Sequence, residues 1–426
     1  MTDLSHQRPE LIVQRAMETP RRMLAVGVDI AKETHVARVV RGNGEELKER
    51  LAFGSSPDGL VRATEWVKGL GVRFGADYVL VGMEPTGLYW QPVYSSLRRA
   101  LPECGVYAVS PAVVAHSRYR RNSNLSKDDD RDALLIARAV VHGECFRPIQ
   151  HTPLTSQMRE ALWLYDRARR AERQARQHLD TMLCRAFPEA LQGAGPDAED
   201  GIRRLLEDSA APSVVARLPE DQWVAAHVRR GRSRRSLRAF YRRAATSCNV
   251  GWIPDSLWHT TWRCAWDRWH DAGGHSASAA VVLDELVARH PMARPLMSIP
   301  AVASVTVAAF LAGIGDPGQY THAAQAEKVF GLDFQRCQSG ASELAPHLSK
   351  RGYALGLHYL YLAALRLTND EHFGQCYKRR CKARGEKASN AVVFALAAKL
   401  VRIMFTITRT GEAFDPARAF HTATHE

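Results

Sequence analysis

The chain has 426 residues, 46% of them hydrophobic, and carries a formal net charge of +13. The hydrophobic fraction excludes wholesale disorder, and the length predicts two or three domains instead of a single core. Residues 1–20 form a polar tail without the apolar region of a secretory signal, and no apolar run approaches the roughly 18 residues that cross a bilayer. We therefore expect a cytoplasmic protein with no membrane partner.

The positive charge predicts the class of partner. Binding to nucleic acid releases counterions from the phosphates, which favours the association of basic proteins. Much of the excess is arginine, whose guanidinium group binds phosphate through two donors. The eight cysteines include no C-x-x-C pair, so we expect free thiols and neither a disulfide scaffold nor a zinc ribbon.

Residues 21–150 predict an α/β domain. Strand-type apolar runs occur, in chain order, at residues 23–30, 35–40, 45–53, 78–83 and 106–109. Helices are expected at residues 56–70, from after 87 to about 101, from 111 onward and over 133–142. This is the order of elements in the ribonuclease-H-like fold, a mixed sheet with helices: three strands, a helix, a strand, a helix, a strand and further helices.

Four carboxylates of this domain form its strongest chemical pattern. Asp29 ends the first strand and Glu84 follows the fourth, and these strands are neighbours in a ribonuclease-H-like sheet, so the two side chains should converge. Asp129 and Asp132 lie in the acidic run 127–133, three residues apart on one face of a helix entry. Carboxylates held this close repel one another unless a cation lies between them, which predicts a site for two divalent ions.

Two alternatives stay open for the acidic run. Aspartates at the start of a helix also favour the positive end of its dipole without binding metal. Asp128 and Asp132 are four residues apart and share a face as well, so the spacing alone does not fix the register of the pair.

Residues 151–292 change to a helical and basic pattern. A heptad seam with one polar break begins at Leu154 and predicts a coiled coil or a long bundle helix. Its arginine-rich outer faces fit a solvated surface as well as a nucleic-acid or dimer contact. Six of the nine tryptophans fall between Trp223 and Trp269, and those at helical spacing are expected to line a core or interface. The most basic stretch, 228–243, supplies candidates for nucleic-acid binding: Arg229, Arg230, Arg232, Arg234 and Arg235.

Residues 293–426 predict a mainly helical C-terminal domain. Residues 299–315 have the outline of a helix-hairpin-helix, a module that offers backbone amides to phosphate. Ala301 and Ala303 stand where that hairpin usually has glycine, so a plain helical hairpin is an equally open interpretation.

Several motifs together resemble one known family. The chain is similar to the DEDD-type insertion-sequence transposases, bridge-RNA-guided recombinases whose N-terminal domain resembles the RuvC resolvase; the family also includes site-specific DNA invertases. Its acidic motif usually reads Lys, any residue, Asp, two residues, Asp, Ala, which selects Asp129 and Asp132. The matching stretches are VGVDIAKETH at 26–35, GMEPTGLYW at 82–90, KDDDRDA at 127–133, FGLDFQRCQSG at 330–340 and SKRG at 349–352.

This resemblance implies a domain plan and a metal site. The plan is a RuvC-like catalytic domain over 21–150, a coiled-coil and basic Trp-rich region over 151–292, and a transposase domain over 293–426. The implied catalytic carboxylates, which would hold two Mg²⁺ or Mn²⁺ ions, are Asp29, Glu84, Asp129 and Asp132.

The resemblance also implies a serine nucleophile, which attacks DNA phosphate and leaves a covalent phosphoserine. The matching position is Ser339, and the metal ions would activate its hydroxyl if the two domains meet across protomers. Gly340 would let the backbone approach the phosphate, and Lys350 and Arg351 suit phosphate contact. Residue physics alone ranks Ser339 barely above Ser342 or Ser349.

The implied partners are donor and target DNA, a noncoding guide RNA and further copies of the chain, in a dimer or tetramer associated with a prokaryotic nucleoid. Two other interpretations remain beside a recombinase or an invertase. One is a RuvC-like structure-specific nuclease that hydrolyses DNA with water, and the other is a noncatalytic nucleic-acid-binding protein that retains the fold. The intact acidic set disfavours the second of these.

Overall fold

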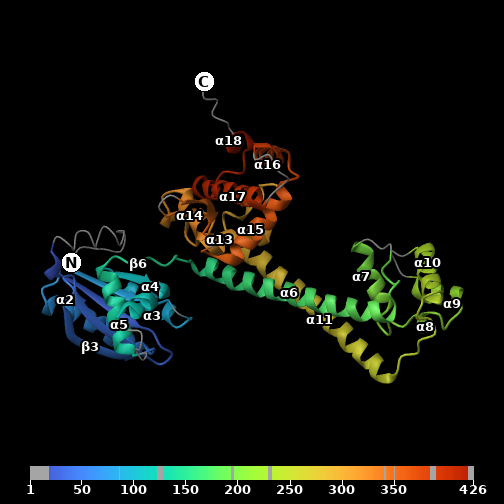
Figure 1. The fold of residues 1–426 in the computed structure, drawn as a ribbon, viewed down its shortest axis with the longest axis horizontal. Coiled ribbons are helices and arrows are strands. Elements are labelled where there is room, and N and C mark those ends of the chain that lie inside the picture. The colour runs from blue at the N-terminus through green and yellow to red at the C-terminus, as the bar shows by residue number, and fades with distance from the viewer. Residues whose placement is uncertain are drawn as a thin grey trace. The chain divides into compact units, whose positions relative to one another are not determined.

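The computed structural model describes residues 19–85, 87–121, 128–192, 196–228, 233–339, 342–349, 351–383 and 390–420. The chain divides into two compact units, residues 1–149 and 150–426 (Figure 1). The first unit is α/β and the second is mainly helical, which confirms the fold class expected from the sequence.

The first unit is built on a six-stranded sheet in the order β3-β2-β1-β4-β5-β6. β1 pairs antiparallel with β2 and parallel with β4, and β5 pairs parallel with β4. The first five strands have the order and directions of a ribonuclease-H-like sheet. The strands are β1 (Met23–Asp29), β2 (Thr34–Arg41), β3 (Glu46–Gly54), β4 (Tyr78–Met83), β5 (Gly105–Val109) and β6 (Cys145–Phe146), of which the short β6 is not apparent in the sequence.

Helices cover both faces of this sheet, because its buried strands alternate side chains between two cores. In β1, Val26 and Val28 pack with α2 and α3, whereas Met23 and Ala25 pack with α4 and α5. Ser56 caps α2 through its side chain, and Pro57 occupies the first turn, as the sequence predicts. The helices are η1 (Pro20–Arg22), α2 (Pro57–Arg73), α3 (Trp90–Ala100), α4 (Pro111–Arg121) and α5 (Asp129–Val141).

The start of α5 corrects one expectation. The sequence pattern placed the acidic run before a helix at 133–142, but the helix begins at Asp129 and contains most of the run in its first turn. The reason is capping: Asp128 stands at the N-cap and its side chain accepts a hydrogen bond from the Asp130 amide.

Two long helices form the spine of the second unit. α6 and α11 lie side by side along much of their length (Figure 1). The predicted seam on α6 is buried within the chain: Met158 and Ala161 belong to one core with α13, α15 and α17, and Leu179 belongs to a second core with the tryptophans. Of the tryptophans at helical spacing, Trp262, Trp266 and Trp269 are buried in this second core and the partly buried Trp258 packs against it, so the prediction that they line a core is confirmed.

The remaining elements of the second unit are short helices and one hairpin. The strands β7 (Phe334–Ser339) and β8 (Ser342–Leu348), which the sequence pattern did not indicate, form an antiparallel hairpin. The helices are α6 (Pro153–Ala186), α7 (Pro196–Leu205), α8 (Pro212–Val215), α9 (Glu220–His227), α10 (Arg234–Ala245), α11 (Ser256–Ala288), α12 (Ala293–Met297), α13 (Ser304–Ile314), η2 (Pro317–Gln319), α14 (Ala323–Val329), α15 (Ala354–Leu367), α16 (Glu371–Ala383), α17 (Asn390–Thr410) and α18 (Pro416–Phe420).

α17 corrects the expectation that no apolar stretch is long enough to cross a bilayer. Its length and composition pass that test, and within the described residues it is the one helix that does. However, 56% of its apolar window is buried inside the protein, where Leu396, Leu400 and Met404 pack in the core of the second unit. Burial in a core explains its composition without a membrane.

Candidate active site

Asp29 and Glu84 stand at the ends of neighbouring parallel strands. β1 and β4 pair with Val28 opposite Met83; Asp29 is the last residue of β1, and Glu84 directly follows the last residue of β4. By strand alternation both acids belong to the face that carries α5, since Val28 and Met83 face the opposite core. The expected convergence of these strand ends is therefore present in the backbone.

A pair of glycines lets α5 lie against this face. Gly27 and Gly82 are partners in the β1–β4 register, each two residues before an acid. A Cβ at Gly27 would overlap the backbone of Ala133, and one at Gly82 would overlap the side chain of Val140. Because Ala133 directly follows Asp132, this close approach brings the acidic turn of α5 to the strand that ends in Asp29.

The four aspartates of the acidic run have four different environments. Asp128 caps the helix, and Asp130 pairs with Arg50 at 2.8 Å and with Arg38 at 3.7 Å. Asp129 is exposed and has no described partner. Asp132 is 2% exposed and accepts two hydrogen bonds from the Arg118 guanidinium, at 3.0 and 2.7 Å. The two aspartates that the family motif selects are thus the two with no capping or surface ion-pair role.

The candidate carboxylates fit a hard divalent ion in their chemistry. All four offer only oxygen ligands, which Mg²⁺ and Mn²⁺ prefer. The buried Asp132 is already balanced by a cation, the Arg118 guanidinium, so this position favours positive charge. Within the described residues, no three His, Cys, Asp or Glu side chains form a group that could hold a metal ion.

His35 fixes the turn that follows Asp29. Its Nδ1 accepts a hydrogen bond from the Ala31 amide at 3.2 Å, and its Nε2 lies 2.9 Å from the Ser55 hydroxyl, which donates to the Lys32 carbonyl at 3.3 Å. The ring is fully buried and packs edge-on against Phe53. Burial lowers the pKa of His35, so the neutral ring that this hydrogen-bond chain requires is favoured.

Ser339 is the last residue of β7, opposite Ser342 of β8. Their side chains, like all of Gly340 and Lys350, lie outside the described residues. The other end of the hairpin is held firmly: the Ser349 hydroxyl donates to the Asp333 carboxylate, and the Ser349 amide donates to the Asp333 carbonyl at 3.0 Å. Ser349, the third candidate serine, therefore has a structural partner.

The same end of the hairpin joins two sequence motifs. A Cβ at Gly352 would overlap the carbonyl oxygen of Val329, and the Tyr353 amide donates to that carbonyl at 2.8 Å. The FGLD and SKRG stretches thus contact each other, and we call these contacts together with the Asp333–Ser349 pair the hairpin base. They fix where the hairpin leaves the helical core.

The predicted nucleic-acid contacts are only partly described. Arg229, Arg230 and Arg232 lie outside the described residues, whereas Arg234, Arg235 and Arg351 are exposed. Arg234 and Arg235 stand in the first turn of α10, where positive charge opposes the helix dipole.

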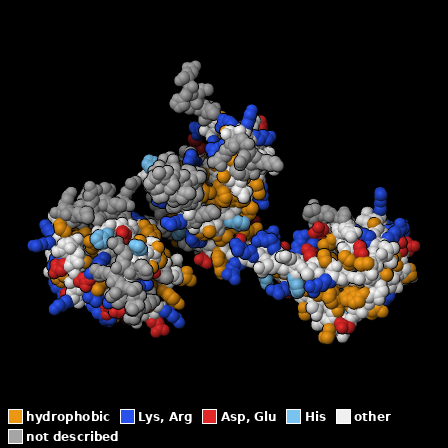
Figure 2. Space-filling model, in the orientation of Figure 1, with side chains coloured by type: hydrophobic (Ala, Val, Ile, Leu, Met, Phe, Trp, Pro, Cys, Tyr) orange, Lys and Arg blue, Asp and Glu red, His pale blue; other side chains and the backbone are white. Residues whose placement is uncertain are grey.

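Figure 2 shows further Lys and Arg side chains gathered over the middle of α6. There Arg169 and Arg170 pair with acids of their own helix, whereas Arg173 pairs with no carboxylate of the described residues.

Three functional candidates were missed in the sequence. Arg118 and Asp333 act through partners distant in the chain, at Asp132 and Ser349, so neither has a local signal. His35 lies inside a quoted motif, and its spacing of six residues from Asp29 was the available signal.

Comparison with known proteins identifies the family of the chain. A family model for DEDD-type transposases of the IS110 kind matches residues 26–188, and a model described as "Transposase IS116/IS110/IS902 family" matches residues 293–378. Together the two matched segments make up more than half of the chain.

Two curated relatives and one solved structure are also similar. The "Putative transposase y4uE" of Sinorhizobium fredii is 27% identical over 47% of this chain and 55% of its own length. The "Insertion element IS110 uncharacterized 43.6 kDa protein" of Streptomyces coelicolor is 26% identical over 31% of this chain and 33% of its own. The chain thus spans about half or less of these relatives. RuvC of T. thermophilus in complex with a Holliday junction substrate is 18% identical, with a TM-score of 0.23, over 29% of this chain and 98% of that one.

Proposed function

The chain belongs to the IS110 family of transposases, and on that premise we propose that it cuts and rejoins DNA as the transposase of an insertion sequence. The observation that carries the proposal is the pairing of β1 with β4, because Asp29 ends β1, Glu84 directly follows β4, and α5 with Asp129 and Asp132 packs on this face of the sheet. Paired acids at adjacent strand ends suit phosphate chemistry assisted by divalent metal.

We assign Asp29, Glu84, Asp129 and Asp132 as the ligands of divalent ions, Mg²⁺ or Mn²⁺. Such ions would lower the cost of deprotonating a nucleophile and stabilise a leaving oxygen on phosphate. The chain's own residues prepare the site: Gly27 and Gly82 admit α5, His35 holds the turn after Asp29, and Arg118 holds Asp132 until an ion or the substrate replaces it.

We assign Ser339 as the nucleophile that forms a covalent link to DNA. Its place at the closed end of a hairpin supports the assignment, because a narrow projecting element can enter a DNA groove or strand junction. The hairpin base, with Asp333 bonded to Ser349, would hold this end in a defined direction. The serine and the carboxylates would then come together from different protomers of a dimer or tetramer.

The basic surfaces support contacts to DNA and to a noncoding guide RNA. Arg234 and Arg235 at the start of α10 interact unfavourably with the positive end of the helix dipole, and a bound polyanion would offset that repulsion. Exposed Arg351 beside the hairpin base is placed to contact phosphate near the serine.

The test is a covalent adduct. Incubating the protein with its element ends and divalent metal should yield a denaturation-resistant protein–DNA adduct, which Ser339→Ala abolishes and Ser342→Ala retains. Asp129→Asn and Asp132→Asn should also abolish it, whereas Asp130→Asn, which loses only the Arg50 and Arg38 pairs, should retain it. If Ser339→Ala still cuts DNA, the protein is a water-using nuclease of the RuvC type instead.

The same assay separates the remaining alternatives. An invertase would rearrange a resident segment without releasing an element, which sequencing of the products would reveal. Sequencing of RNA that copurifies with the protein would test the guide.

A further inference from the structure

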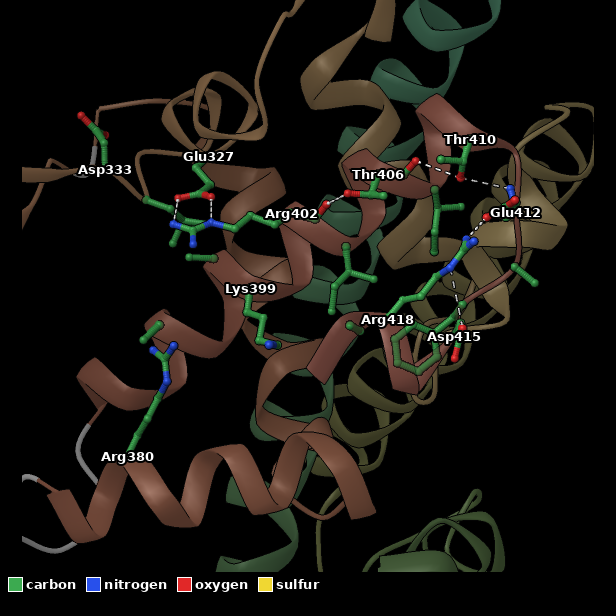
Figure 3. A pocket seen from close by; sticks show the side chains of 18 residues that line it. Glu327, Asp333, Arg380, Lys399, Arg402, Thr406, Thr410, Glu412, Asp415 and Arg418 are labelled. Carbon is green, nitrogen blue, oxygen red and sulfur yellow. Dashed lines mark hydrogen bonds and ion pairs between the residues drawn. The ribbon is translucent and has the colours of Figure 1, made fainter. Parts of the chain in front are cut away.

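A cavity of about 470 Å³ opens between α16, α17 and the segment 412–419, next to the hairpin base. Leu332 and Asp333, the two residues that precede β7, form part of its wall. Figure 3 shows Arg380 of α16 and Lys399 of α17 reaching toward the same space from two helices. The lining is mixed, with apolar side chains of α17 beside charged ones.

The charges of this cavity are unevenly paired. Glu327 is held by Arg402, Glu412 and Asp415 by Arg418, and Asp333 by the Ser349 hydroxyl. Every carboxylate of the lining therefore has a partner. Lys399 and Arg380 pair with no carboxylate of the described residues, and the Lys399 ammonium lies 4.3 Å from the centroid of the Phe420 ring.

Further positive charge lies on the same end of α16 as Arg380. Lys378, Arg379 and Lys382 are exposed on the last turns of α16 with no carboxylate partner in the described part of the chain. Burial lowers the pKa of Lys399, and the nearby Arg380, Arg379 and Arg402 lower it further. Cations gathered at one end of a cavity repel each other, and an anion between them would relieve that repulsion.

We propose that this cavity binds a phosphate group of a nucleic-acid backbone, with Lys399 and Arg380 as its charged contacts. Arginine and lysine from two facing helices, one a planar fork and the other a compact ammonium, suit a tetrahedral oxyanion better than a planar carboxylate. The proposal rests on the proposed function, since it names a contact to the same DNA or RNA.

The position of the cavity relative to the hairpin suits the bound phosphate to positioning a nucleic-acid strand. β7 has six residues, so its far end with Ser339 lies roughly 17–20 Å from Asp333 along an extended strand. A phosphate held at Lys399 would fix the strand several nucleotides from the position that Ser339 reaches. The cavity would thus set the register of the bound strand relative to the hairpin.

Equilibrium binding without metal tests this contact apart from catalysis. Full-length protein is titrated against a short labelled DNA duplex, a single DNA strand and an RNA of the same sequence, with EDTA present, over a range of salt concentrations. Lys399→Gln with Arg380→Gln should weaken binding about tenfold, because charge-assisted hydrogen bonds are lost. The slope of log affinity against log salt should fall by about 0.7–0.9 for each lost cation.

Two matched variants control the experiment. Lys399→Arg keeps the charge and should keep the salt slope. Arg409→Gln removes an exposed cation of the same helix outside the cavity, and it should leave affinity and slope near wild type. Thermal melting verifies that each variant is folded.

Each outcome of the titration supports or overturns a specific part of the proposal. A loss confined to DNA or to RNA probes identifies which strand occupies the cavity. Wild-type affinity and slope in the double variant, or an equal loss in Arg409→Gln, would overturn the proposal while leaving the transposase assignment intact. If the wild-type protein binds none of the probes, the proposed function itself fails.

Discussion

At the scale of single residues, the packing of α5 against the sheet depends on a glycine that has no side chain. Gly27 has no side chain, and the backbone of α5 takes the space that a Cβ would fill. This contact brings the acidic turn of α5 close to Asp29, which stands two residues after Gly27. Glycine at this position, close to a candidate catalytic acid, therefore has a packing reason.

Gly27→Ala tests this contact. We expect it to destabilise the first unit by roughly 1–3 kcal/mol, because the atoms that the methyl group meets are backbone and cannot rotate away. Activity should fall further than stability, since α5 carries Asp129 and Asp132. Urea unfolding and adduct formation measure the two effects. Gly69→Ala, in an open position of α2, should instead stabilise by about 0.5–1 kcal/mol, and equal effects of the two changes would refute the argument.

His151 predicts a dependence of stability on pH. Burial, with a contribution from Arg159, lowers the pKa of His151 from 6.5 to about 4, so the folded state holds the ring neutral. The stability that this provides is complete above pH 6.5 and is lost as the pH falls through 4. His151→Gln should show a shallower loss of stability across that window in urea midpoints. Replacement of the exposed His178 is the control, and an unchanged slope in His151→Gln would contradict the assignment.

At the scale of elements, local patterns predicted the first unit well. The five long strands follow from alternating or continuous apolar runs, and Ser56 and Pro57 mark the start of α2 before any tertiary contact is known. The β7–β8 hairpin could not be predicted, because FQRCQS has little apolar alternation and its base depends on contacts with Val329 and Gly352. The pairing of Arg118 with Asp132 is likewise a tertiary event.

The hairpin base makes a testable claim about the three candidate serines. Ser349→Ala removes the hydroxyl that donates to Asp333, so the hairpin should become less well held and the rate of strand transfer should drop about tenfold. The covalent adduct should nevertheless form, because Ser349 is a positioning residue. Rates of product formation and gel analysis of the adduct measure both. An adduct that survives Ser339→Ala and disappears in Ser349→Ala would reassign the nucleophile.

The turn between α12 and α13 holds an alanine in a backbone conformation that favours glycine. Ala301 has a φ of 57° and is the only described non-glycine residue with positive φ, at a position where a glycine was expected. An alanine in this conformation costs about 1–2 kcal/mol, and a glycine avoids that cost. The larger conformational entropy of glycine in the unfolded state offsets part of the gain. Ala301→Gly should therefore stabilise the protein by up to about 1 kcal/mol in thermal or urea unfolding. Ala308→Gly, inside α13, should destabilise by about as much.

At the scale of the whole molecule, the proposed chemistry is divided between two compact units. The carboxylates lie in the unit that ends at Ile149, and the hairpin with Ser339 lies in the unit that begins at Gln150. Each unit has its own cores, so damage to one set of residues should leave the other unit folded. Two inactive proteins with damage in different units can therefore be mixed.

Mixing tests whether the active site is shared between protomers. Asp132→Asn and Ser339→Ala proteins should each be inactive alone. If carboxylates of one protomer serve the serine of another, mixed oligomers contain one site with both intact parts, and the adduct should reappear on the Asp132→Asn chain. A tag of different size on each chain identifies which one carries the DNA. No recovery from oligomers shown to contain both chains would mean that each protomer builds its site from its own residues, whereas an adduct on the Ser339→Ala chain would exclude Ser339 as the nucleophile.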